Sequence, residues 1–167
     1  MALDALKGRK AEIARVITLE NGKTAAEAAA EVESGIGEWE YQLNEGLRFC
    51  GETVPSAHEG VLAYCMRQPL GVCAIVSPWN FPFNVPCRKI VPALMAGNAC
   101  VFKPASLTPW VGLKFVELFA ETGLPEGVLN FVTGGGSTVG EELTVNPAVR
   151  AISFTGSVQT GGRVAQA

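Results

Sequence analysis

Four short segments rich in proline, glycine and hydroxyl residues each follow an apolar run: 77–82, 103–106, 133–140 and 154–157. In the first, two prolines stiffen the chain on either side of Asn80. A rigid amide donates well to a developing oxyanion, because it needs no reorganisation when charge appears. Asparagine is also favoured as a helix cap. The spacing therefore fits either an oxyanion donor or a structural cap.

The second and third segments have the residue types of a nucleotide site. Lys103 and Ser106 offer a cation and a hydroxyl, which suit a ribose or phosphate, although a lone lysine at a strand end is often only solvated. In 133–140, backbone N–H groups could approach a pyrophosphate, or the glycines could simply form a turn. The spacing from Gly134 is G-x-G-x-x-x-G and no acidic residue follows Glu142, which differs from the Rossmann fingerprint. The fourth segment presents Ser157 at a predicted helix start.

The elements around these segments alternate in type. Strands are predicted at 72–76, 99–102, 128–132 and 151–154, and helices at 83–96, at 108–122 with Thr108 as cap, at 137–145 and from 157 onward. This alternation is typical of an α/β fold with a parallel sheet. Ligands of such sheets collect at the carboxyl ends of the strands. The four segments together therefore make a dinucleotide site the leading hypothesis from the residues alone.

The first part of the chain has a different character. It predicts a helical hairpin: one helix over 3–20, then a second that runs from a capping box at Thr24 and Glu27 toward residue 49. A polar loop is expected at 51–60 and a strand at 61–66. Residues 1–59 carry eleven acidic and six basic residues, whereas 60–167 carry five and seven. We therefore expect a helical segment over 1–59 and a second domain over 60–167.

The composition excludes several classes of function. The five cysteines, at 50, 65, 73, 87 and 100, lack the close spacing of a metal site. Most of them lie in apolar runs, which is typical of buried, reduced thiols in a cytoplasmic protein. The single histidine, His58, lies in a polar stretch typical of a surface loop. No basic run, signal peptide or apolar stretch of membrane-spanning length is present. We therefore expect no metal, nucleic-acid or membrane partner.

An ordered set of motifs along nearly the whole chain resembles the NAD(P)-dependent aldehyde dehydrogenase superfamily, in detail its semialdehyde-oxidising members. The motifs are Ser77-Pro78-Trp79-Asn80-Phe81-Pro82, Pro92-Ala93-Leu94, Ala96-Gly97-Asn98, Val101-Phe102-Lys103-Pro104-Ala105-Ser106, Gly123-Leu124-Pro125, Gly127-Val128-Leu129-Asn130 and Ile152-Ser153-Phe154-Thr155-Gly156-Ser157. The resemblance implies an incomplete Rossmann-like parallel sheet, part of the NAD(P)-binding domain, over 60–167. It also implies a small aldehyde as the substrate, NADP or NAD as cofactor, and a homo-oligomer for a full-length member.

The resemblance also assigns roles to single residues. Asn80 would be the side-chain donor of the oxyanion hole, and Ser106 stands where many NAD-preferring members carry a glutamate, which leaves room for a 2′-phosphate. Thr160 stands where the family usually has an aliphatic residue. The remaining implied cofactor contacts are Ser77, Pro78 and Trp79 along the channel, Lys103 at the adenosine ribose, Gly136 and Gly140 near the adenosine, Phe154, Thr155 and Gly156 beside the nicotinamide half, and Ser157 near the pyrophosphate.

The family mechanism also needs a nucleophilic cysteine and a glutamate that activates water. In family members both lie beyond the turn that resembles 154–157, and none of the five cysteines here has the nucleophile's context; Cys87 and Cys100 are predicted core residues. We therefore expect a truncated segment that is inactive alone. The alternatives are a stand-alone nucleotide-binding or regulatory module and a structural fragment without ligand affinity.

An incomplete sheet with exposed helix faces should leave apolar surface uncovered, which promotes self-association. We expect the purified chain to form concentration-dependent oligomers or aggregates in size-exclusion chromatography with light scattering. A monodisperse monomer that melts cooperatively would contradict this expectation.

Overall fold

The computed structural model describes residues 1–167 and contains a four-stranded and a two-stranded sheet with helices around the larger one. The helices are α1 (Ala2–Gly8), α2 (Lys10–Asn21), α3 (Ala25–Gly46), α4 (Asn84–Met95), α5 (Pro109–Ala120), α6 (Glu141–Val145) and α7 (Val158–Gln166), with a turn of π-helix, η1 (Gly136–Gly140), before α6. The strands are β1 (Glu52–Val54), β2 (Ala63–Cys65), β3 (Val72–Val76), β4 (Ala99–Lys103), β5 (Leu129–Phe131) and β6 (Val149–Phe154).

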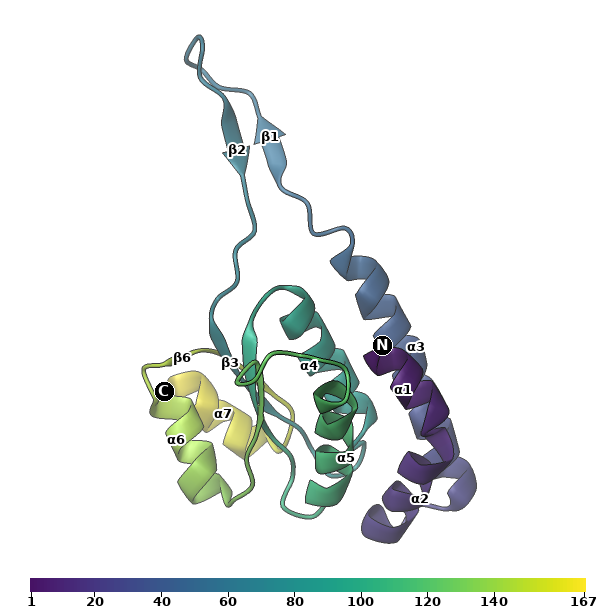
Figure 1. The fold of residues 1–167 in the computed structure, drawn as a ribbon. Coiled ribbons are helices and arrows are strands. Elements are labelled where there is room, and N and C mark those ends of the chain that lie inside the picture. The colour runs from purple at the N-terminus through teal and green to yellow at the C-terminus, as the bar shows by residue number, and fades with distance from the viewer.

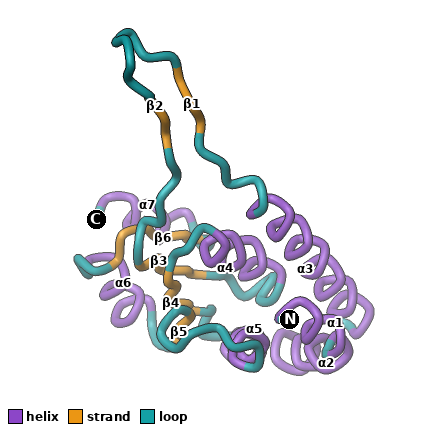
Figure 2. The backbone as a smooth tube through the Cα atoms, turned by 45° about the horizontal axis from the view of Figure 1, so that its top comes forward, coloured by secondary structure: helices purple, strands orange, loops and turns teal.

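The larger sheet is parallel throughout and has the strand order β5-β4-β3-β6. Helices α4 and α5 cover one face and α6 and α7 the other (Figure 2). Both faces of β3 are therefore covered, which explains its uninterrupted apolar sequence. The predicted α/β class with a Rossmann-like parallel sheet is confirmed.

A further helical layer, α1 to α3, packs on the outer side of α4 and α5 (Figure 1). Phe115 of α5 lies at the centre of the contact, with its ring centre 5.5 Å from Trp39, 5.7 Å from Phe83 and 6.2 Å from Phe102. One hydrophobic cluster thus contains residues of α3, α4, β4 and α5. The helical layer and the sheet share a continuous core.

The predicted single helix over 3–20 is wrong, because the chain forms two helices that meet at Arg9. The Arg9 guanidinium donates to Glu117 of α5 (3.1 Å), to Glu121 directly after α5 (2.8 Å) and to Glu12 of α2. These contacts to α5 accompany the break between α1 and α2.

The predicted capping box of α3 is confirmed, since Glu27 N–H donates to Thr24 Oγ1 (3.3 Å) and Thr24 N–H to the Glu27 carboxylate (3.0 Å).

The strands β1 and β2 form an antiparallel arm that protrudes from the rest of the chain (Figure 1). The strand predicted at 61–66 is present at Ala63–Cys65, but the loop predicted at 51–60 contains β1. The residues of β1 are exposed, so its sequence shows no buried face. None of the helices combines the length and apolar character needed to cross a bilayer.

Helix α5 begins after Thr108 as predicted, but the Thr108 side chain makes no capping hydrogen bond. Its buried Oγ1 has no hydrogen-bond partner. The Glu20 carboxylate, at the end of α2, instead accepts hydrogen bonds from the backbone N–H groups of Trp110 (2.7 Å) and Val111 (2.8 Å). A carboxylate at a helix N-terminus also interacts favourably with the helix dipole. The cap of α5 is therefore supplied by a residue distant in sequence.

We predict that Glu20→Ala lowers the free energy of unfolding by about 1–2 kcal/mol, the usual cost of a lost helix cap. Thr108→Val should be neutral or slightly stabilising, because it replaces an unpaired buried hydroxyl with a methyl group. Urea unfolding of both variants, with the exposed Glu126→Ala as control, measures the difference. A larger loss for Thr108→Val than for Glu20→Ala would contradict the assignment.

Candidate functional site

The four segments singled out by sequence lie together at the carboxyl edge of the parallel sheet. Hydrogen bonds link neighbouring segments: Ser77 N–H donates to Lys103 O (3.3 Å), Thr155 N–H to Val76 O (3.1 Å) and Ser106 Oγ–H to Gly134 O (3.4 Å). We call this row of loops the carboxyl edge. Every residue predicted to contact a cofactor belongs to it or to the first turn of an adjoining helix.

The loop after β3 presents Asn80 without using it as a cap. Asn80 is exposed, and the N-terminus of α4 at Phe83 receives no side-chain cap from its own segment. The helix-cap interpretation of Asn80 is therefore wrong. Beside it, Trp79 is 55% exposed and Pro78 is half-buried, whereas Ser77 is buried with an Oγ that has no hydrogen-bond partner.

This loop is held by side chains at the end of α2, in the turn that follows it and in α3. The Asn21 amide donates to Trp79 O (2.7 Å), and the Lys23 ammonium lies 4.1 Å from the centre of the Phe81 ring. The buried Glu31 carboxylate of α3 pairs with Lys23 and accepts hydrogen bonds from the backbone N–H groups of Phe83 (2.9 Å) and Asn84 (3.2 Å). These contacts cap α4 and attach the loop to the helical layer.

Lys103 and Ser106 follow β4 in different environments. Lys103 is only 6% exposed, and its ammonium donates to Pro104 O (3.1 Å) with no carboxylate beside it. Burial lowers the pKa of this ammonium. An ammonium has three donors, so the chain leaves donor capacity here for a ligand. Ser106 is exposed.

The glycines of 133–140 have two different roles. Gly134 has a φ of +153°, and a Cβ there would lie 2.4 Å from Val139 Cγ2, so the turn into η1 requires glycine. A Cβ at Gly136 would meet nothing within 4 Å, and one at Gly140 only Gly135 O at 3.8 Å. The fold itself does not require glycine at Gly136 or Gly140. Their absent side chains leave open space on the chain's surface.

The loop after β6 leads into α7 through a capped turn. Ser157 Oγ accepts a hydrogen bond from Thr160 N–H (3.2 Å) and lies 2.9 Å from Thr160 Oγ1. A Cβ at Gly156 would lie 2.5 Å from the Phe154 ring, which folds back over the turn. Thr155 is exposed at the strand end. The Ser157 hydroxyl therefore serves the helix, and the N-terminus of α7 lies at the carboxyl edge.

Sequence reasoning missed Lys89 of α4. This side chain is half-buried, and its ammonium donates to Val76 O (3.3 Å) at the end of β3. Burial lowers its pKa from 10.5 to about 8. Lys89 lies inside a helix whose sequence contains no catalytic motif, so only the contact with the strand end reveals it.

The three buried cysteines offer no activated thiolate. Cys73, Cys87 and Cys100 are buried as predicted, and burial raises the pKa of each thiol, to about 12 for Cys100. Cys65 ends β2 and Cys50 precedes β1, and both are exposed. His58 is exposed between β1 and β2. None of these residues belongs to the loops of the carboxyl edge.

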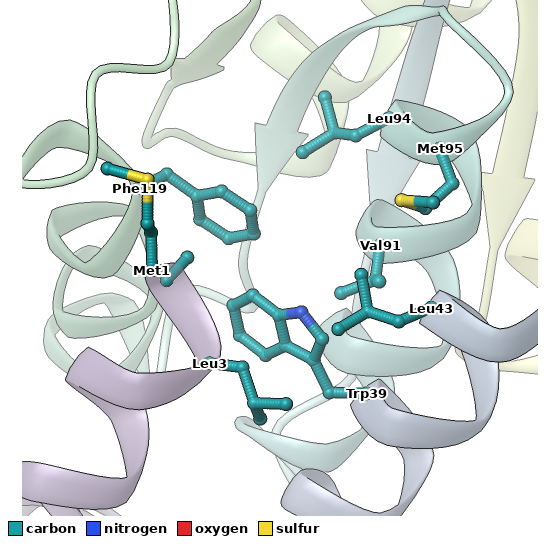
Figure 3. A pocket seen from close by; sticks show the side chains of 9 residues that line it. Met1, Leu3, Trp39, Leu43, Val91, Leu94, Met95 and Phe119 are labelled. Atoms are coloured by element: carbon teal, nitrogen blue, oxygen red, sulfur yellow. The ribbon is translucent and has the colours of Figure 1, made fainter. Parts of the chain in front are cut away.

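An apolar cavity of about 170 Å³ lies between the helical layer and helices α4 and α5, where the Trp39 indole faces Leu3, Leu43 and Phe119 (Figure 3). Its nine lining residues are all apolar. It is bounded by the C-terminal parts of α4 and α5, which point away from the carboxyl edge. Because all nine residues that line it are of apolar types, the cavity does not suit a nucleotide.

The depressed pKa of Lys89 predicts a pH-dependent stability. Below about pH 8 the charged ammonium is disfavoured in the folded chain, and between about pH 8 and 10.5 the unfolded chain binds more protons, so stability rises with pH. Lys89→Met should therefore gain stability relative to wild type at neutral pH, and lose that advantage as the pH rises through this window. Thermal melts against pH measure the effect, with Lys10→Met as an exposed control. The same pH dependence in both variants would contradict the assignment.

Comparison with known proteins agrees with this geometry. Residues 1–167 match the aldehyde dehydrogenase family. The chain is 44% identical over 164 residues to an alpha-ketoglutaric semialdehyde dehydrogenase of Bacillus subtilis (98% of this chain, 34% of the relative). It is 45% identical over 150 residues to the succinate-semialdehyde dehydrogenase [NADP(+)] GabD of Escherichia coli (90% and 31%).

Solved structures give the same result. A crystal structure of an Escherichia coli NADP-dependent enzyme superimposes with a TM-score of 0.95 at 41% identity, covering 99% of this chain and 34% of that one. The chain thus spans about a third of the length of the relatives it matches. The sequence, the parallel sheet and the motifs along its carboxyl edge agree, and the chain belongs to the aldehyde dehydrogenase family.

Proposed function

We propose that this chain forms the helical part, over 1–59, and most of the nicotinamide-dinucleotide-binding part, over 60–167, of an enzyme that oxidises an aldehyde or semialdehyde to the carboxylic acid. The observation that carries the proposal is the convergence of four loops at the carboxyl edge with unsatisfied polar groups between them. The buried Lys103 ammonium and the buried Ser77 hydroxyl both lack sufficient partners within the chain. Buried polar groups are normally hydrogen-bonded, so these two fit a polar ligand.

The chemistry of the donors fits each part of a dinucleotide. Lys103 would donate to the adenosine ribose, and Gly136 and Gly140 would let the adenosine approach the chain closely. The N-terminus of α7 at Ser157 would face the pyrophosphate, because helix N-termini favour anions. Ser77, Pro78 and Trp79 would line the channel, and Phe154, Thr155 and Gly156 would adjoin the nicotinamide half.

The choice between NADP and NAD would depend on Ser106. A carboxylate at this position could accept hydrogen bonds from both ribose hydroxyls but would repel a 2′-phosphate. The exposed serine carries no charge and leaves space. We therefore propose that NADP is accepted at least as well as NAD.

Asn80 would donate its side-chain amide to the oxyanion that forms when a nucleophile adds to the aldehyde carbonyl. Its exposed amide, free of any capping role, supports this assignment. The bound nicotinamide accepts the hydride in this class of reaction. Because the three buried thiols have raised pKa values and the two exposed ones lie at the arm, the chain alone would bind cofactor without oxidising aldehyde.

Two features support wider proposals for the whole protein. The arm exposes apolar side chains, among them Leu62, Tyr64 and Met66, which suit contact with a second copy in a homo-oligomer. The five free cysteines suit a cytoplasmic location.

Calorimetric titration with NADP⁺ and NAD⁺ tests cofactor binding. We predict saturable binding of NADP⁺ with a micromolar Kd, weakened by about ten-fold or more in Lys103→Met, because a buried charged donor is lost. Ser106→Glu should weaken NADP⁺ binding relative to NAD⁺. Lys10→Met and Ser56→Glu, remote from the carboxyl edge, serve as matched controls. No binding at millimolar cofactor would overturn the proposal and favour a structural fragment.

A further inference from the structure

We propose that Asn21, Lys23 and Glu31 are positioning residues that hold Asn80 in the geometry of an oxyanion donor. This inference rests on the proposed function, in which Asn80 is that donor. Asn21 ends α2, Lys23 lies in the turn that follows, and Glu31 lies in the second turn of α3, all outside the carboxyl edge itself. Together they fix the chain on both sides of Asn80.

Glu31 fixes the chain after Asn80. Its side chain is 1% exposed, and its carboxylate accepts hydrogen bonds from the Phe83 and Asn84 N–H groups while pairing with Lys23. Asn84 is also held from the same helix, since its amide donates to Ser34 Oγ (2.9 Å). The first turn of α4 therefore has one position relative to α3.

Asn21 and Lys23 hold the two immediate neighbours of Asn80. The Asn21 amide binds the carbonyl of Trp79, and the Lys23 ammonium lies over the ring of Phe81. With both neighbours held and prolines at 78 and 82, the backbone of Asn80 has little freedom. The Asn80 side chain is left free for an external partner.

These contacts serve geometry more than core stability. Trp79 and Phe81 are 55% and 48% exposed, so holding them buries little apolar surface. An oxyanion donor acts through its fixed position, because a donor that must reorient as charge develops loses its advantage. The loop is therefore exposed but held in place, as a role in positioning Asn80 requires.

The test uses the chain itself and needs no cofactor. In ¹⁵N relaxation spectra we expect the Asn80 backbone order parameter to be about 0.85 in wild type and to fall below about 0.6 in Asn21→Ala and Lys23→Met. In Glu31→Gln, the Phe83 and Asn84 amides should exchange with solvent about ten-fold faster, because the charged acceptor is lost. Lys23→Arg keeps the cation over the ring and should retain the wild-type order parameter.

The chain offers a matched control for each variant. Asn44 donates only within its own helix, and Lys10 pairs with the exposed Glu33, so Asn44→Ala, Lys10→Met and Glu33→Gln should leave Asn80 unchanged. If Glu31→Gln does not fold, the Asn80 order parameters of Asn21→Ala and Lys23→Met test the inference. A wild-type Asn80 order parameter in both of these variants would overturn the inference, even if their melting temperatures fall. Cofactor titration of wild type separately decides the proposed function.

Discussion

A buried carboxylate, that of Glu31, joins the helical layer to the N-terminus of α4. An isolated charge in this environment would be costly, but Glu31 has the Lys23 ammonium and two N-terminal amides of α4 as partners. Removing one partner of such a buried pair typically costs about 3–5 kcal/mol. These partners favour one position of α3 on α4. That docking places the α2–α3 turn against the loop that carries Asn80.

The loop after β4 depends on close packing beneath it. Gly112 of α5 lies so near the sheet that a Cβ there would be 2.9 Å from Pro104 Cβ and 3.2 Å from the Phe102 ring. This approach fixes Pro104, the residue whose carbonyl accepts from the Lys103 ammonium. The partner of the Lys103 ammonium is thus held in place by apolar contacts with α5.

Local sequence signals predicted much of this structure. The apolar run of β3, the capping box at Thr24, the start of α5 at Pro109 and the glycine-rich turn after β5 all follow from neighbouring residues. The four loops were expected at one edge because parallel strands place their carboxyl ends together.

The contacts that sequence could not predict join distant parts of the chain. Glu20 caps a helix 90 residues away, Glu31 caps one 52 residues away, and Arg9 reaches α5 over 108 residues. Lys89 lies in no recognisable sequence motif, so only its burial and its contact with Val76 O in the folded chain identify it. Strand β1 was not predicted, because all of its residues are exposed and its sequence therefore lacks the apolar alternation of a half-buried strand.

We infer that a nicotinamide dinucleotide lies along the carboxyl edge. Amide chemical-shift mapping of the ¹⁵N-labelled chain on addition of NADP⁺ tests it most directly. We predict shifts concentrated at Ser77, Lys103, Ser106, Gly136 and Ser157, with the helical layer around Trp39 unaffected. Shifts centred on the Trp39 cavity, or an unchanged spectrum at millimolar NADP⁺, would contradict the account.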